Sequence, residues 1–459
     1  MASTQAAIAA NRFGLGSRPG ELDDIGGDHA DWLLAQLAER DPTPDPPTTT
    51  TELLRDIQRL QATRNAARRE DSDTREETAR NYREFIRSNY REQAARRYTL
   101  ATSSNLPFRE RIVHFWTNHF AISSDKQAVT AIVGTFEDEA IRPYVTGRFA
   151  DMLRAVEQHP GMILYLDNQA SSGPGSRASR FASRRGQDRG LNENLAREIL
   201  ELHTLGVDGG YTQTDVTTFA KVITGWSIGA RSDRGNDANI GEFVFREQMH
   251  EPGAKTILGK RYAENGLREG EAVLDDLARH PSTARFLSEK LARHFVADEP
   301  PSSLVDGLAA TYLRSDGDLS AVYTALVESG EAWREPLSKF KTPQDYIVSS
   351  YRAFDTQPRI PERVLNFLDL LGQRPYTPGS PAGWPDTMAH WDGGDALLKR
   401  IDWASSIGRQ ISDRARPVEL GEAILGPVLS DHTKTAVARA ESPSQGLTLL
   451  LASPEFQRR

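Results

Sequence analysis

Apolar residues recur three and four positions apart along most of this 459-residue chain, which is the spacing of one face of an α-helix. Glycine and proline clusters separate these stretches, and no internal repeat organises them. The sequence therefore predicts an all-α fold, in which many helices cross one another in a large orthogonal assembly. One exception lies near residues 242–262, where EFVFRE alternates, HEPGAK turns and TILGKRY returns. We expect one small β-hairpin there.

Helical periodicity continues from end to end, so we expect a single helical domain over residues 1–459 rather than two independent modules. Residues 51–98 are highly charged and contain few apolar side chains. They predict a charged helical arm within that domain, which is either a solvated surface or a surface that binds a partner. Residues 171–190 are rich in glycine, serine and arginine and predict a mobile loop.

The composition excludes several classes of protein. The chain has no cysteine, which rules out a disulfide framework, thiolate metal sites and a cysteine nucleophile. The net charge of -8 argues against a general nucleic-acid binder. No stretch approaches the roughly 18 apolar residues of a spanning helix, and no signal peptide is visible. We expect a soluble chain, cytoplasmic as the sequence stands and exported or periplasmic if a leader was removed.

Three predicted helices each carry a polar side chain on the face that the apolar residues occupy. His119 lies on the apolar face of Pro107–Ala121, His203 on that of Leu191–Leu205, and Asp215 on that of the helix after Thr212. A buried polar group costs about 1–3 kcal/mol if it lacks a partner. We therefore predict that His119, His203 and Asp215 meet in a buried pocket and share a proton, a water or a metal ion.

Each of these groups also has a local alternative. A single histidine on an apolar face is usually bonded to a backbone carbonyl, and Thr212-x-x-Asp215 matches a capping box. Glu198 is the better carboxylate candidate near the pocket, because Glu201 and His203 point to nearly opposite sides of their helix. Arg197 could hold an anionic substrate. The pair Glu110 and His114 has one-face spacing on the polar side of its helix, and we interpret it as an exposed ion pair.

Two loops add further candidates. His250 in the turn HEPG and Trp384 in a long Pro/Gly loop could reach a ligand, although such residues more often hold a loop to the core. Positive charge is concentrated in the predicted mobile loop, at Arg177, Arg180, Arg184, Arg185 and Arg189. These side chains could capture an anionic substrate or polymer, and the alternative is a solvated linker.

Several longer segments resemble the bacterial family known as domain of unknown function 1800. The matching segments include FWTNHFA at 115–121, HPGMILYLDN at 159–168, GLNENLAREILELHTLGVDGGYTQTDV at 190–216, TGW at 224–226 and AGWP at 382–385. The resemblance implies a mostly helical, single-domain bacterial protein that accompanies a co-encoded exported protein. It adds Asn168, Asn194 and Trp226 as candidate ligand-binding residues. The chain departs from the family pattern at His114 and Thr117, which makes His114 a poor candidate for a shared function.

Two functions stay open. The first is an enzyme with a buried histidine and carboxylate pocket that acts on an anionic or polar substrate. Its catalytic candidates are His119, His203, Glu198, Asp215 and Arg197, and a divalent metal ion is its candidate cofactor, held by His119, His203 and Asp215. The second is a non-catalytic scaffold or assembly factor that holds a partner protein.

Overall fold

The structure is a computed structural model that describes residues 2–39, 41–69, 73–187, 190–230, 239–356, 361–413 and 415–459. Helices account for most of these residues, and the strands among them form two small antiparallel sheets of two strands each. The prediction of an all-α fold is confirmed. None of the described helices is long and apolar enough to cross a membrane.

The N-terminal half contains the arm and two of the helices that border the candidate site. Its α-helices are α1 Thr4–Ile8, α2 Glu21–Ile25, α3 His29–Ala38, α4 Thr50–Arg69, α5 Arg75–Ser103, α6 Pro107–His119, α7 Gln127–Thr130, α8 Val133–Phe136, α9 Phe149–Glu157, α10 Pro160–Tyr165, α11 Arg177–Ser183, α12 Asn194–Glu198 and α13 Gln213–Val222. Shorter helical turns include the wide turn η2 Glu137–Ile141, followed by η3 Arg142–Tyr144, and the wide turn η5 Ile199–Thr204 that continues α12.

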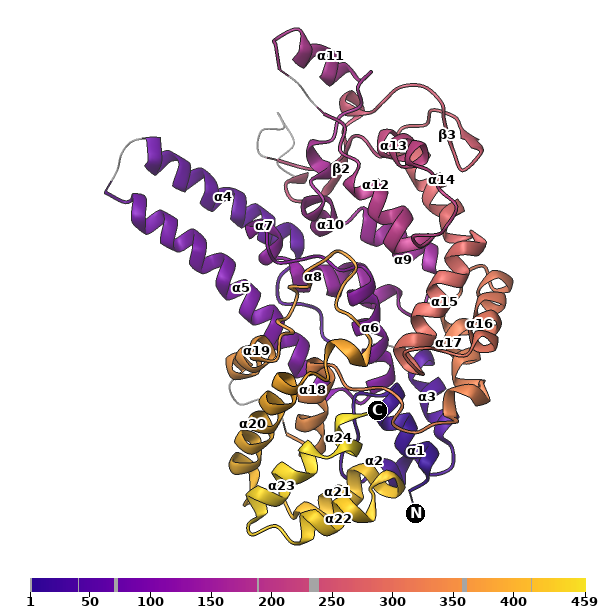
Figure 1. The fold of residues 1–459 in the computed structure, drawn as a ribbon. Coiled ribbons are helices and arrows are strands. Elements are labelled where there is room, and N and C mark those ends of the chain that lie inside the picture. The colour runs from indigo at the N-terminus through magenta and orange to yellow at the C-terminus, as the bar shows by residue number, and fades with distance from the viewer. Residues whose placement is uncertain are drawn as a thin grey trace.

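The C-terminal half adds a further set of helices around the same centre. They are α14 Leu267–Ala278, α15 Pro281–Phe295, α16 Ser302–Arg314, α17 Leu319–Glu328, α18 Pro343–Ala353, α19 Pro361–Leu370, α20 Gly394–Ile411, α21 Pro417–Leu425, α22 Asp431–Ala438, α23 Pro443–Ala452 and α24 Pro454–Gln457. In Figure 1 the yellow helix α21 lies beside the indigo helix α2, and the two chain ends are close together.

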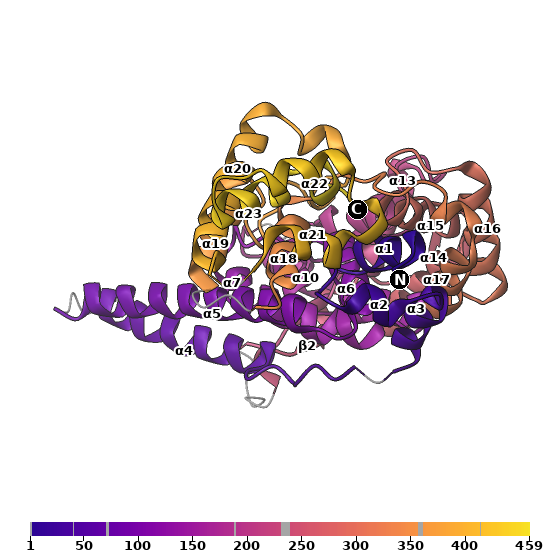
Figure 2. The same ribbon diagram turned by 90° about the horizontal axis from the view of Figure 1, so that it is seen from below.

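The helices α4 and α5 run antiparallel and project from the rest of the molecule (Figures 1 and 2). Apolar side chains of α4 are buried near its start, at Leu53, Leu54 and Ile57. The outer part of the pair is dominated by charged residues, which stabilise a solvated helix without a core. The base of α5 packs against α8 and α18 and therefore belongs to the wall of the candidate site.

The strands lie in and beside the predicted region, but their pairing differs from the expected hairpin. Strand β2, Phe243–Phe245, pairs with β1, Trp226–Ile228, whereas β3, Lys255–Ile257, pairs with β4, Lys260–Tyr262. The turn of the second pair is formed by Leu258 and Gly259, whose φ angles of 49° and 76° are both positive, as a tight two-residue hairpin turn requires. The segment HEPG is thus a connection between two sheets.

The segment 171–190 contains helix α11 where the sequence predicted a loop. Ser176 begins this helix, and its side chain accepts a hydrogen bond from the Ser179 amide at 3.1 Å. The hydroxyl of Ser172 lies 3.0 Å from that of Ser176 and 2.9 Å from that of Ser179, in a buried cluster. A serine-rich composition favours an irregular loop. Here, however, Ser176 caps the helix, and Ser172 and Ser179 form the buried hydrogen bonds that anchor it.

Two hydrophobic clusters form the interior of the described residues. The larger cluster surrounds α6, α9, α13 and α15, and the smaller one lies between α18, α20 and α23. Leu365 and Val428 pack against both clusters. The prediction of a single domain stays a prediction, and the candidate site lies where α5, α6, α15 and α18 approach one another.

Candidate active site

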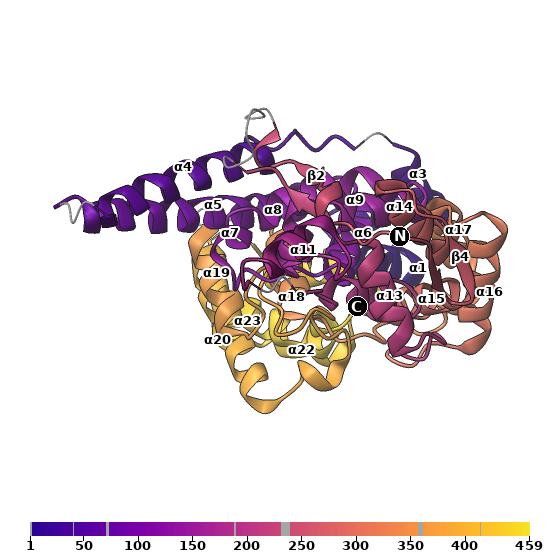
Figure 3. The ribbon, with the colours of Figure 1, turned by 90° about the horizontal axis from the view of Figure 1, so that it is seen from above.

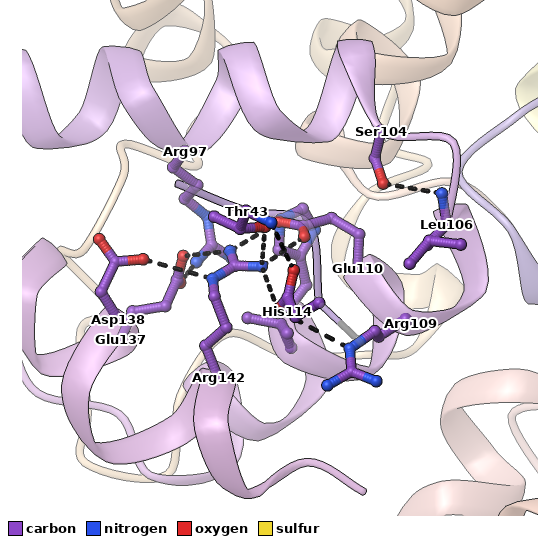
Figure 4. Close-up of polar contacts among 12 residues, drawn as sticks. Thr43, Arg97, Ser104, Leu106, Arg109, Glu110, His114, Glu137, Asp138 and Arg142 are labelled. Atoms are coloured by element: carbon purple, nitrogen blue, oxygen red, sulfur yellow. Dashed lines mark hydrogen bonds and ion pairs between the residues drawn. The ribbon is translucent and has the colours of Figure 1, made fainter. Parts of the chain in front are cut away.

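The polar face of α6 is buried, not exposed as the sequence suggested. Glu110 and His114 are only 4% and 6% exposed. Arg142 donates to both carboxylate oxygens of Glu110, at 2.7 and 3.0 Å, and Arg97 from α5 pairs with Glu137 beside it (Figure 4). The prediction of an exposed ion pair was wrong because α5 and the η2–η3 turn cover this face of the helix. Charge-assisted bidentate contacts of this kind offset the cost of burying the charges.

His114 is held in its neutral form inside this network. Its Nδ1 accepts a hydrogen bond from the side-chain amide of Gln344 at 2.9 Å. Burial lowers the pKa of His114 well below the usual value, and the positive charges of Arg97 and Arg111 lower it further. The Nε2–H group faces Glu110 at 3.6 Å, which is too long for a good hydrogen bond.

A cavity opens beside His114, between the base of α5, one side of α6, the end of α15, the start of α18 and the loop after α19. About 80 Å³ of it is open to the centres of water molecules, which is several times the space that one water needs. The polar residues that line it include Arg97, Arg111, Thr117, Asn118, His294, Gln344, Asp345, Gln373, Tyr376 and Asp386. Trp384 and three prolines, Pro375, Pro378 and Pro385, provide apolar wall.

A second group of buried charges lies on the α18 side of the cavity. Asp345 accepts a hydrogen bond from Arg111 at 3.1 Å and lies 3.0 Å from the Nε of Arg459. Burial alone would raise the pKa of Asp345, but the two arginines outweigh it and hold the pKa far below its usual value. Arg459 also lies 3.6 Å from Asp386, so this guanidinium connects the carboxylates of α18 and of the loop.

His294 and Asp386 form a pair at the wall of the cavity. The Nδ1 of His294 lies 2.7 Å from Oδ2 of Asp386, so the carboxylate fixes the tautomer that carries its proton on Nδ1. The Nε2 of His294 is buried and has no hydrogen-bond partner among the described residues. Burial lowers the pKa of His294 below its usual value although Asp386 raises it in part. His294 is therefore a neutral imidazole whose Nε2 lone pair has no partner among the described residues.

Helix α6 positions the loop that carries Asp386. The side chain of Asn118 makes two hydrogen bonds with the backbone of Trp384: its amide donates to the carbonyl at 2.9 Å, and its oxygen accepts from the Trp384 N–H at 2.7 Å. Gly383 has a φ of +85°, and a Cβ there would clash with the carbonyl oxygen of Asn118. Only glycine fits this contact, which explains the glycine of the segment AGWP.

We expect Gly383→Ala to lower the free energy of unfolding by more than about 1 kcal/mol, because the methyl group meets both a left-handed backbone and Asn118. The loop should also move away from α6 and weaken the contact between Asp386 and His294. Chemical denaturation measures the first effect, and the NMR titration of His294 measures the second. Gly379→Ala is the matched control, since Gly379 lies in the same loop and a methyl group added there would meet no atom within 4 Å. Equal stability of the two variants would contradict this account.

His119 and His203 do meet in the core, with ring centroids 6.2 Å apart. The Nε2 of His119 lies 3.1 Å from the backbone carbonyl of His203, and His203 Nδ1 lies 2.8 Å from Glu157. Glu157, which is fully buried on α9, was not among the predicted site residues. His119 thus bonds to a backbone carbonyl, as expected for a single buried histidine, but that carbonyl belongs to a distant segment. His203 pairs with a carboxylate that also comes from a distant segment. Neither histidine lines the cavity.

Asp215 does not join these histidines, so the predicted three-residue metal site is not assembled. Its carboxylate completes a capping box with Thr212 and also accepts the Leu258 amide at 2.8 Å. The N–H and hydroxyl of Thr212 satisfy one carboxylate oxygen, as the capping alternative anticipated, and the Leu258 amide from the β3–β4 turn satisfies the other. Within the ranges that the structure describes, no group of three or more histidine, aspartate and glutamate side chains is placed to hold a metal ion.

The other predicted residues are dispersed, and Trp384 is the one among them that lines the cavity. Glu198 is half-buried, and burial raises its pKa. Arg197 pairs with Glu193 at 3.2 Å, and Asn194 is exposed. Asn168 donates to the carbonyl of the fully buried Trp226 at 3.0 Å. His250 is buried between the Thr224 carbonyl and Glu269. The contacts of Asn168 and His250 stabilise the fold around β1.

Most residues that line the cavity carry little signal in the sequence. His294 lies in the last turn of an amphipathic helix, and Asp386 lies two residues after the predicted Trp384. The proximity of Asp386 to AGWP is a usable signal, whereas nothing near His294 marks it. The two residues are far apart in the chain and meet only through the packing of α15 against the loop.

Comparison with known proteins assigns the chain to a family. The family described as "Protein of unknown function (DUF1800)" matches residues 8–458. The chain belongs to the DUF1800 family. All the residues of the cavity lie within the part that matches DUF1800. Neither the comparison with curated proteins nor that with solved structures found a match.

Proposed function

We propose that this DUF1800 protein is an enzyme whose active site is the cavity between α5, α6, α15 and α18, with His294 as its general base. One observation carries the proposal. The Nε2 of His294 is buried without a hydrogen-bond partner among the described residues, while Nδ1 is bonded to Asp386. An unpartnered buried acceptor is costly, and such groups are frequent at sites where chemistry requires them.

The arrangement supports proton transfer. Asp386 keeps the proton of His294 on Nδ1, so the lone pair of Nε2 is free to take a proton from a substrate hydroxyl or from a water molecule. The imidazolium that forms is then stabilised by the Asp386 carboxylate at 2.7 Å. The lowered pKa of His294 keeps the imidazole neutral before the transfer.

The charges of the cavity favour a polar substrate that carries little net charge. Arg97 and Arg111 line the cavity, but each is already paired, with Glu137 and with Asp345 respectively. At the wall, the Thr117 hydroxyl already donates to Glu137 and the Gln344 amide to His114, which leaves the side-chain N–H of Gln373 to bind a polar group. Trp384 offers a surface for an apolar portion.

A panel of chromogenic esters, amides, phosphoesters and glycosides tests the proposal with the purified chain. We expect turnover of one of these classes, and we expect His294→Gln to lower kcat by about 100- to 10,000-fold while KM changes little. Asp386→Asn should lower kcat as well, because an amide favours the wrong tautomer of His294.

The matched control is His390→Gln, since His390 is an exposed residue of the same loop. It should leave kcat unchanged. Turnover that survives both His294→Gln and Asp386→Asn would overturn the proposal, and so would the absence of turnover across the whole panel in well-folded protein.

A second candidate function, a scaffold for a partner protein, is favoured by the projecting pair α4 and α5 (Figure 3). Exposed arginines such as Arg80 and Arg87 lie along α5. The partner would be an exported protein encoded beside this one. Cross-linking to that protein that is lost in Arg80→Glu/Arg87→Glu and retained in His294→Gln would favour the scaffold over the enzyme.

A further inference from the structure

The outer face of α11 carries a dense group of arginines around an exposed aromatic ring. Arg189 lies outside the described residues, whereas Arg177, Arg180, Arg184 and Arg185 are all exposed, and Phe181 between them is 54% exposed. At about 100° per residue these five side chains share one side of the helix and its C-terminal end. The guanidinium of Arg185 lies 4.3 Å from the centre of the Phe181 ring, so the ring and the charge present one continuous surface. We call these five residues the α11 patch.

The α11 patch stands on a well-anchored helix. The inner face of α11 buries Ser179 and Ala182, and the Ser172 hydroxyl binds those of Ser176 and Ser179. The preceding turn is fixed by Glu251, which accepts the Gly175 amide at 2.7 Å, and by the Gly173 amide, which donates to the Met249 carbonyl at 2.9 Å. The arginines are therefore held together at a defined place rather than spread by a flexible chain.

Among the described residues, no ion pair neutralises the arginines of the α11 patch, and the acidic side chain of Glu247 lines an adjoining groove with Arg177 alone of the four. A shallow groove along α11 is lined by the α11 patch together with Ala178, Ala182, Gln187 and Gln248. None of these lining residues is acidic, and the described part of the chain gives none of the four arginines an ion pair. In a chain with a net charge of -8, such a patch directs the molecule toward an anionic partner.

We propose that the α11 patch is a docking surface for a membrane rich in anionic phospholipid. Guanidinium groups bind phosphate oxygens through paired hydrogen bonds, and an exposed aromatic ring among them inserts at the level of the headgroups. Helix α11 lies at the outer end of the molecule, away from the arm and the C-terminal helices (Figure 1). A projecting helix meets a flat surface without steric conflict, whereas it forms no deep cleft around a small anion.

The chemistry of the α11 patch also explains why a membrane is favoured over an acidic polymer. An acidic polymer without bases is bound by arginine alone, so an exposed phenylalanine at the centre of the row adds little to its binding, whereas a single-stranded nucleic acid would stack its bases on the ring. A lipid surface uses both groups, since the arginines gain from the surface potential and the ring gains from partial burial in the interface.

Sedimentation with vesicles tests the proposal with the full chain. We expect the protein to bind vesicles of 70% phosphatidylcholine and 30% phosphatidylglycerol, and not vesicles of phosphatidylcholine alone. Arg180→Glu/Arg184→Glu should lower the partition coefficient by about tenfold or more. Phe181→Ser should weaken binding as well, and its residual binding should fall steeply with added sodium chloride.

The matched control is Arg314→Glu/Arg409→Glu, which makes the same change in net charge at two exposed arginines elsewhere. It should bind the anionic vesicles like the unmodified protein, and thermal unfolding should show that all variants are folded. No binding to anionic vesicles, or equal binding by the Arg180→Glu/Arg184→Glu protein, would overturn the proposal. Competition by inorganic phosphate beyond that of chloride at equal ionic strength would assign the α11 patch to a soluble phosphate ligand instead. Binding to a single-stranded oligonucleotide without binding to vesicles would assign it to an acidic polymer.

Discussion

Asp345→Asn is expected to lower the free energy of unfolding by about 3–5 kcal/mol. The Asp345 carboxylate lies between Arg111 at 3.1 Å and Arg459 at 3.0 Å, and both arginine side chains are almost completely buried. Removing this charge leaves two guanidinium groups in the interior with less compensation than their desolvation requires. The loss is therefore mainly the cost of the charges that remain, rather than the value of one ion pair.

Urea denaturation at pH 7.5 measures this effect. Asp395→Asn is the matched control, because its carboxylate is 81% exposed and pairs with Lys399 on the surface of α20. That variant should change the free energy of unfolding by less than about 1 kcal/mol. A loss below about 1 kcal/mol in Asp345→Asn would show that Arg111 and Arg459 find other compensation in the folded chain.

The second large effect is a loss of stability in mild acid. His114 and His119 are buried, and burial lowers the pKa of each well below the usual value; Arg97 then lowers that of His114 further, and Lys290 that of His119. Between the folded pKa and the unfolded pKa of about 6.5, only the unfolded chain binds these protons. The two neutral histidines therefore contribute fully to the free energy of unfolding above about pH 6.5, and this contribution is lost as the pH falls. Each histidine lowers the free energy of unfolding by about 1.4 kcal/mol per pH unit in this range.

Denaturation curves between pH 8 and pH 5 test this expectation. The free energy of unfolding should fall by about 3 kcal/mol per pH unit below pH 6.5 from these two residues together, and the lowered pKa of His294 acts in the same direction. A His114→Gln/His119→Gln variant should be less stable at pH 7.5 but should depend less on pH. His390→Gln/His432→Gln replaces two exposed histidines and should keep the full dependence. An unchanged slope in the first variant would refute the assignment.

The class of fold and the core face of α6 were predictable from the sequence. Phe108, Ile112, Phe115, Trp116 and Phe120 form the expected apolar arc, and all of them are buried. The periodicity of apolar residues shows which side chains share one face of a helix, and it places Glu110 and His114 on the face opposite the apolar arc. It does not report that α5, η2 and α18 cover that side as well, because this depends on contacts between distant segments.

Pairing over long distances explains the remaining differences. His119 and His203 were predicted to meet, and they do, but the partner of His203 is Glu157 from α9. Asp215 is explained by a local pattern that spans four residues, so the capping interpretation could be made in advance. The contact between His294 and Asp386 depends on how a loop of irregular backbone is fixed on α6, and no local propensity encodes that placement.

Helix α6 has no side that faces solvent. Every residue from Pro107 to Trp116 is buried, and His119 is buried too. One face belongs to the apolar interior and the other to the charge network and the cavity. A substitution that shifts the helix at one face therefore also displaces the side chains of the other face. Sequence drift, which ordinarily accumulates on the outer stripe of a helix, has no such stripe here. The segment FRERIVHFWTNHF is consequently constrained by packing and by electrostatics at the same time, and compensating changes would have to arise in several helices together.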